Sequence, residues 1–238
     1  MKIALLGYGK MGKAIESIAL ERGHEIILKI NRNNQHEADI AHLQLADVII
    51  EFTNPESAFD NVSKCLRSGL AVVSGSTGWN HKLPEAQALC KEHNGAFIHA
   101  SNFSIGVNLF FELNKMAAQL MQSHTDYNVK VSETHHTQKL DAPSGTAISI
   151  AEQILEQYTR LEGWSLQEQP RQLHIEAFRV DDVPGTHVVT YDSEIDTISL
   201  SHTAHSRKGF AFGAVLAAEF LHNKKGIFTM RDILFSKH

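Results

Sequence analysis

The stretch Ile3-Ala4-Leu5-Leu6-Gly7-Tyr8-Gly9-Lys10-Met11-Gly12 places a short apolar run directly before three glycines spaced G-x-G-x-x-G. Apolar residues then recur at helical spacing on one stripe, formed by Met11, Ala14, Ile15, Ile18 and Ala19. In this context the glycines allow a tight turn and let the backbone approach a pyrophosphate at the helix N-terminus. The turn Gly7, Tyr8, Gly9, Lys10, Met11 and Gly12 is therefore predicted to bind a dinucleotide. The alternative is a glycine-rich turn without a ligand.

The same alternation of strand and helix continues through the first hundred residues. Further buried strands are predicted at Glu25–Ile30, Asp47–Phe52, Leu70–Ser74 and Ala96–His99, with a helix over Pro55–Ser68. Strands separated by helices require crossover connections. The sequence therefore predicts an α/β domain of the Rossmann type, with a doubly wound parallel sheet.

The pattern changes after Asn102. A helix is predicted from Val107 to about Gln122, a strand at Tyr127–Ser132, and a second helix whose apolar stripe runs from Ala147 to Tyr158. Strand-like segments then follow one another without helices between them, at His174–Val180, His187–Tyr191 and Thr197–Ser201. This order favours an α+β domain with a mixed or antiparallel sheet.

The segment Phe210–Phe220 returns to helical spacing and could pack back onto the first domain. We therefore expect a dinucleotide-binding domain made of residues 1–104 and 207–238. The substrate-binding and oligomerisation domain, residues 105–206, would be inserted between these two parts.

Composition narrows the class of protein. The 238 residues are 42% hydrophobic and 21% charged, which is typical of an ordinary soluble protein. A net charge of −5 gives no electrostatic basis for binding nucleic acid. Two cysteines, Cys65 and Cys90, form no disulfide framework, and no signal peptide or membrane-spanning run is found. A cytoplasmic location is expected, without a membrane or nucleic-acid partner.

The end of the second strand bears on cofactor choice. NAD-binding sheets carry an acidic residue there, which accepts a hydrogen bond from the ribose 2′-hydroxyl, whereas this chain has Asn31-Arg32. Arg32 could pair with a 2′-phosphate, and Lys10 and Lys13 add positive charge nearby. We therefore predict NADPH as a cofactor at least as good as NADH. Arg32 could instead be a solvated loop residue.

Two further turns follow predicted strands and are expected on the same edge of the sheet. They are Gly75, Ser76 and Thr77 after the fourth strand, and Ala100, Ser101, Asn102 and Phe103 after the fifth. Each is predicted to contact the dinucleotide, and each could be an ordinary connecting loop.

The densest chemistry lies in the segment Glu133–Ala147, which joins a predicted strand to a helix. Histidine is a residue type that can titrate near neutral pH, and along a strand His135 and His136 would project to opposite faces, which would give them different roles. Lys139 offers a proton donor, and free N–H groups at the helix start near Gly145 and Thr146 favour a carboxylate. Ordinary surface, core and capping roles are the alternatives. No metal site is predicted, because adjacent histidines diverge and no third ligand is evident.

The segment Glu133–Ala147 closely resembles the signature of the dihydrodipicolinate reductase family, in which a histidine pair precedes a lysine and the string Asp-Ala-Pro-Ser-Gly-Thr-Ala. Gly75-Ser76-Thr77-Gly78-Trp79, the stretch Ser101–Asn108, His205-Ser206-Arg207 and Met230-Arg231-Asp232 are similar to further family strings. Thr137-Gln138 differs from the basic residues found in many relatives.

The resemblance implies NADPH- or NADH-dependent reduction of 4-hydroxy-tetrahydrodipicolinate to tetrahydrodipicolinate, a step toward diaminopimelate and lysine. It implies that His135 is the catalytic proton donor and acceptor and Lys139 a proton donor. His136, Gly145 and Thr146 would bind the dicarboxylate substrate. Family members are usually homotetramers built through the sheet of the substrate domain. Another Rossmann-type amino-acid or polyol dehydrogenase, or a non-catalytic dinucleotide sensor, remains as an alternative.

Overall fold

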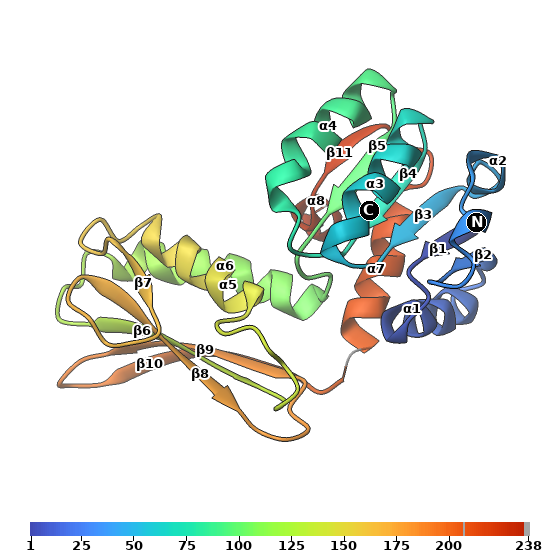
Figure 1. Ribbon diagram of the computed structural model, residues 1–238. Coiled ribbons are helices and arrows are strands. Elements are labelled where there is room, and N and C mark those ends of the chain that lie inside the picture. Colours follow the sequence, from blue (N-terminus) through green and yellow to red (C-terminus); the bar gives the residue numbers. More distant parts are fainter. Residues whose placement is uncertain (207, 236–238) are drawn as a thin grey trace. The chain divides into compact units, whose positions relative to one another are not determined.

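The computed structural model describes residues 1–206 and 208–235. They form two compact units, one of residues 1–105 and 208–235 and the other of residues 106–206 (Figure 1). Arg207 and residues 236–238 were assigned to the first predicted domain and lie outside the described residues.

The first unit is built on a parallel sheet of six strands in the order β11-β5-β4-β3-β1-β2 (Figure 1). The strands are β1 (Lys2–Leu6), β2 (Glu25–Ile30), β3 (Val48–Glu51), β4 (Ala71–Ser74), β5 (Ala96–His99) and β11 (Gly226–Phe228). From β1 the chain adds β2 on one side of the sheet and then β3, β4, β5 and β11 on the other side. The crossover connections therefore run in both directions from β1. The predicted doubly wound sheet is confirmed.

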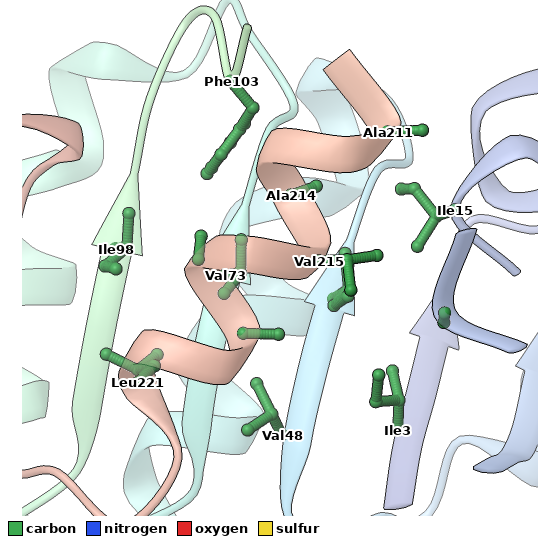
Figure 2. Close-up of a cluster of buried hydrophobic side chains, with 14 of the residues drawn as sticks. Ile3, Ile15, Val48, Val73, Ile98, Phe103, Ala211, Ala214, Val215 and Leu221 are labelled. Atoms are coloured by element: carbon green, nitrogen blue, oxygen red, sulfur yellow. The ribbon is translucent and has the colours of Figure 1, made fainter. Parts of the chain in front are cut away.

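Helices cover both faces of this sheet because its central strands are apolar on both sides. On one face, α1 (Lys10–Glu21) and α7 (Lys208–Leu221) pack with α8 (Met230–Phe235). Figure 2 shows Ala214, Val215 and Leu221 of α7 lying over Val48, Val73 and Ile98 of three strands. Helix α7, from the C-terminal part of the chain, therefore packs in the same core as strands from the first hundred residues.

The opposite face is covered by α2 (Ile40–Leu43), α3 (Pro55–Arg67) and α4 (Leu83–Glu92). Short 3-10 turns, η1 (Gln35–Glu37) and η2 (Asn80–Lys82), precede α2 and α4. Both cysteines are reduced and buried among the apolar residues of this face. Because the strands of this sheet are parallel, the loops that follow them lie at one edge of the sheet.

The second unit is a five-stranded sheet with helices on one face. Its strands are ordered β10-β9-β6-β8-β7, with both parallel and antiparallel pairs. The elements are α5 (Ile105–Met121), β6 (Asn128–His135), α6 (Gly145–Leu155), β7 (Gly163–Ser165), β8 (Gln172–Arg179), β9 (Gly185–Asp192) and β10 (Thr197–Ala204). Its own buried cluster joins α5 and α6 to β6, β8 and β9. The predicted mixed sheet is confirmed.

Within residues 1–206 and 208–235, none of the helices is both long enough and apolar enough to cross a membrane.

Candidate active site

The glycine turn joins β1 to α1, and its glycines meet different surroundings. Gly7 has φ +99°, and a Cβ there would come within 1.9 Å of the Phe52 carbonyl oxygen. At Gly12 a Cβ would approach the Gly7 carbonyl oxygen to 2.5 Å, whereas at Gly9 it would meet nothing within 4 Å. Gly7 and Gly12 are thus required by the close approach of the backbone. Gly9 instead leaves an open surface at the start of α1.

An open cavity of about 870 Å³ lies over this turn, beyond the carboxyl ends of β1, β2 and β3. Of the predicted cofactor residues, Gly7, Tyr8, Gly9, Asn31 and Arg32 line it. Lys10, Met11 and Gly12 do not line it, and Met11 packs against the core. The structure adds lining residues that sequence analysis did not select, namely Asn33, Gln35, Thr53, Asn54, Ser57, Asn61 and Lys64.

The cavity is basic. Lys13, Arg32 and Lys64 are among its lining residues, and no Asp or Glu of the described chain is. Lys64 reaches it from α3, with its Nζ donating to the Ala38 carbonyl oxygen at 3.1 Å. Asn31 shapes the loop, since its Oδ1 accepts from the Asn33 N–H at 2.8 Å. A ligand with phosphate groups suits this lining.

The other two predicted cofactor turns do not line this cavity. Ser76 is 6% exposed, and its Oγ donates to Glu51 Oε1 at 2.6 Å, so its side chain points inward. Phe103 belongs to the core, and its ring lies 5.8 Å from that of Phe52. Asn102 is buried and its Oδ1 accepts from the Ser104 N–H at 2.8 Å. The side chains of Ser76, Asn102 and Phe103 therefore point into the protein and stabilise the two loops. The backbone of these loops remains available to contact a ligand.

Gly75 and Thr77 lie beside Ser76, and Ala100 and Ser101 lead into Asn102. A Cβ at Gly75 would come within 2.1 Å of the Phe52 ring, while Thr77 and Ser101 are exposed. Glu51, at the end of β3, organises this edge. Its buried carboxylate accepts hydrogen bonds from Ser74 and Thr53 as well as from Ser76. Sequence analysis gave Glu51 no role, because a single acidic residue at the end of an apolar strand has no recognisable pattern.

The turn and the cavity fit a dinucleotide. Gly9 leaves open space at the start of α1, α1 presents free N–H groups there, and the lining supplies cations. Gly9 and Arg32 both line the cavity, where they would hold the pyrophosphate and a 2′-phosphate of a dinucleotide.

The segment Glu133–Ala147, which carries the two histidines and Lys139, lies in the second unit. His135 is the last residue of β6, is 8% exposed, and lies on the same face of the strand as the fully buried Glu133. Its Nδ1 is 3.4 Å from Glu133 Oε2. His136 is only half-buried and lines a different, smaller cavity with Thr137 and Gln138. The two histidines are thus in different surroundings.

Lys139 and Gly145 lie in the loop and at the helix start that follow. Both Asp141 carboxylate oxygens accept from Lys139 Nζ at 2.9 Å, and this lysine is 22% exposed. Ser144 caps α6 by accepting from the Ala147 N–H at 3.1 Å, and a Cβ at Gly145 would meet nothing within 4 Å. The start of α6, with Gly145 and Thr146, is therefore open on that side and can take a carboxylate.

Charge is balanced around Glu133. Burial raises the pKa of Glu133, but interactions with His187 and Ser144 and the charge of His135 outweigh it and lower the pKa to about 2. Burial lowers the pKa of His135 to about 4, against the opposing charge of Glu133. At neutral pH the pair is therefore a carboxylate beside a neutral imidazole.

Glu133, His135 and His187 also place one ligand atom each within 4.8 Å of the others, a geometry that could hold a metal ion. Arg179 Nη1 already lies 3.5 Å from Glu133 Oε1, and Lys139 adds positive charge beside His135. A dication would therefore lie close to the Arg179 guanidinium, with Glu133 as the one carboxylate among the three candidate ligands. The cluster is better explained as a balanced group of ionisable side chains.

Arg179 and His187 were not selected from the sequence. Arg179 ends β8, and its guanidinium donates to the carbonyl oxygens of Lys139 at 3.2 Å and Asp141 at 2.5 Å, so it holds the loop that carries Lys139. His187 of β9 pairs in register with Glu133. Neither residue belongs to a recognisable sequence motif, so the sequence alone provided no reason to select them.

Comparison with known proteins agrees with the family resemblance along almost the whole chain. The family model "Dihydrodipicolinate reductase, N-terminus" matches residues 1–103, and "Dihydrodipicolinate reductase, C-terminus" matches residues 106–234. The chain is 52% identical over 235 residues to 4-hydroxy-tetrahydrodipicolinate reductase of Christiangramia forsetii, covering 98% of both chains. It is 37% identical over 207 residues to the Chromobacterium violaceum enzyme of the same name, covering 82% of this chain and 76% of that one.

Among solved structures, the fold is similar to dipicolinate-bound dihydrodipicolinate reductase from Paenisporosarcina sp. TG-14, with a TM-score of 0.78 and 22% identity. The match covers 96% of this chain and 97% of that one. With both family models matched and a half-identical relative aligned end to end, this chain belongs to the dihydrodipicolinate reductase family.

Proposed function

We propose that this protein reduces 4-hydroxy-tetrahydrodipicolinate to tetrahydrodipicolinate with NADPH or NADH, in the biosynthesis of diaminopimelate and lysine. Family membership and the names of its relatives support this activity. The observation that carries it is the meeting of His135 and the start of α6 at one buried carboxylate, Glu133. A proton-transfer group and a carboxylate-binding helix end are the two parts that this reaction needs.

The predicted catalytic and substrate-binding residues are given the following roles in this reaction. His135 exchanges a proton with the substrate, and Lys139 donates a proton to the ring nitrogen or polarises it. His136, Gly145 and Thr146 hold the substrate carboxylates. The dinucleotide, when bound, supplies the hydride. Dipicolinate in the structure of the Paenisporosarcina relative supports a small dicarboxylate ligand for this chain as well.

The dinucleotide is proposed to bind at the glycine turn, at Gly75–Thr77 and along Ala100–Phe103. Arg32, Lys13 and Lys64 line the cavity without an opposing carboxylate of the described chain, which favours NADPH. Replacing Arg32 by Ala should reduce kcat/KM for NADPH about tenfold, or about 1.4 kcal/mol, with little effect on NADH. Lys91→Ala on the exposed part of α4 is the matched control. Equal losses with both cofactors would contradict this preference.

A homotetramer in the cytoplasm is proposed from the resemblance to the family. One face of the five-stranded sheet carries no helix of the second unit, since α5 and α6 pack on the other face. Light scattering on the purified protein would measure the mass of the assembly, and a monomer would exclude the tetramer.

The activity is tested by following NADPH oxidation at 340 nm, with the substrate generated from pyruvate and aspartate semialdehyde by a coupling synthase. We expect turnover that is lost in Lys139→Ala and kept in Lys130→Ala, a matched lysine on the exposed side of β6. Folded protein that binds NADPH but does not turn over would favour a dinucleotide sensor. Turnover only with amino acids or polyols would favour another dehydrogenase.

A further inference from the structure

Glu133 is a charged side chain enclosed in the second unit, with 1% of its surface exposed. Polar groups face it from each element packed against it: His135 on its own strand, Arg179 at the end of β8, His187 on β9 and Ser144 at the start of α6. Lys139 and Asp141 lie in the adjoining loop. Burying a carboxylate costs free energy unless cations and hydrogen-bond donors compensate it, as Arg179 and the Ser144 N–H do here.

The two oxygens of Glu133 serve different elements. Oε1 accepts a hydrogen bond from the Ser144 N–H at 3.0 Å and lies 3.5 Å from Arg179 Nη1. Oε2 lies 3.4 Å from His135 Nδ1 and 3.6 Å from His187 Nε2. One oxygen therefore holds the start of α6, and the other faces the two imidazoles.

The same arrangement decides which nitrogen of His135 can face a ligand. A carboxylate beside Nδ1 favours the proton on that nitrogen, as in other carboxylate–histidine pairs. Nε2 lies on the side of Gly185, where an added Cβ would come to 3.0 Å. Because residue 185 has no side chain, no Cβ crowds Nε2.

We propose that Glu133 is a positioning residue, which fixes the orientation and the Nδ1-protonated form of His135 and ties this imidazole to the start of α6. It thereby sets the spacing between the proton-transfer group and the carboxylate-binding helix end. The proposal rests on the proposed function of His135, Gly145 and Thr146, and gives a role to a residue outside that set.

The negative charge of Glu133 also acts on the pKa of His135, which supports the positioning role. Burial, together with the charges of His187, Lys139 and Arg179, lowers the pKa of His135 to about 4 against the opposing charge of Glu133. An opposite charge within about 4–6 Å commonly moves a pKa by about 1–3 units. Removing the charge while keeping the shape should therefore lower the pKa of His135 by about one unit or more.

Two variants separate charge from position. Glu133→Gln keeps an oxygen acceptor, so the pH limb of kcat/KM that reports His135 should move about one unit toward lower pH, with only a small loss of maximal kcat. Glu133→Ala removes the acceptor as well, so kcat should fall about 10–100-fold at every pH, a part of what general acid–base catalysis contributes. Glu176→Gln on β8, half-buried and 3.9 Å from Lys130, is the matched control and should match the wild type.

A second readout does not depend on turnover. In histidine-labelled protein, ¹⁵N NMR should show His135 protonated at Nδ1 in the wild type and titrating at lower pH in Glu133→Gln. This keeps the test valid if Glu133→Ala does not fold, or if the wild type does not reduce the substrate and the proposed function fails.

Three results would overturn the role of Glu133. One is an unchanged pH profile in a folded Glu133→Gln variant that turns over. Another is a His135 resonance with the same tautomer and titration in both proteins. The third is wild-type activity lost on dialysis against a chelator and restored by Zn²⁺, which would make Glu133, His135 and His187 a metal site.

Discussion

Single glycines in the β1–α1 turn have separable effects on stability and on binding. A Cβ at Gly12 would meet the Gly7 carbonyl oxygen at 2.5 Å, and this backbone atom cannot move aside cheaply. Gly12→Ala should therefore lower the free energy of unfolding by about 1–3 kcal/mol. Gly9→Ala meets nothing within 4 Å and should leave stability nearly unchanged, yet weaken NADPH binding at the open surface.

Thermal unfolding and titration of NADPH fluorescence measure the two effects on the same variants. A Gly9→Ala variant that binds NADPH as tightly as the wild type would place the dinucleotide away from this turn.

Single site residues could be found from the sequence only where they stand close together in the chain. His135, Lys139, Gly145 and Thr146 were selected because they lie within fifteen positions of one another. Arg179 and His187 lie far along the chain and reach Glu133 only through strand register, since His135 pairs with Arg179 and Glu133 pairs with His187. Register across a mixed sheet depends on packing that a single sequence does not reveal.

Among the elements, the apolar strands β1 to β5 and the helices with a clear apolar stripe were predicted, whereas helix α4 and the shortest strands were not. β7 and β11 have three residues each, too few for any period to be seen. β6 was predicted to end at Ser132 but continues to His135. Its inward face carries Glu133 and His135, so polar residues interrupt the apolar alternation exactly where the site is built.

Helix α3 depends on an N-cap residue that also lines the basic cavity. Its N-cap, Asn54, accepts from the Ser57 N–H at 3.0 Å and also lines the basic cavity. Asn54→Ala should destabilise the protein by about 1 kcal/mol through loss of the cap. Asn54→Asp keeps the cap and the stability, but its negative charge should weaken NADPH binding.

Chemical denaturation and NADPH titration of the two variants distinguish these effects. If Asn54→Asp bound NADPH as well as the wild type, the phosphates would not lie near the start of α3.

For the whole molecule, the buried ionisable groups of the second unit predict how stability depends on pH. The pKa of His135 is lowered from 6.5 to about 4 by burial, so the unfolded chain binds a proton more readily between these values. Stability should therefore fall as the pH drops from 6.5 to about 4. Glu133 has its pKa lowered from 4.5 to about 2, so its contribution is present above pH 4.5 and is lost as the pH falls toward 2.

The two groups act in the same direction and in adjoining pH windows, so a single variant can separate them. His135→Gln removes the group that titrates in the upper window. It should flatten the loss of unfolding free energy between pH 6.5 and 4 and leave the loss below pH 4.5 in place. Urea denaturation at a series of pH values measures both windows. An upper window that stays as steep in His135→Gln would mean that other groups, and not this buried imidazole, make the fold sensitive to acid.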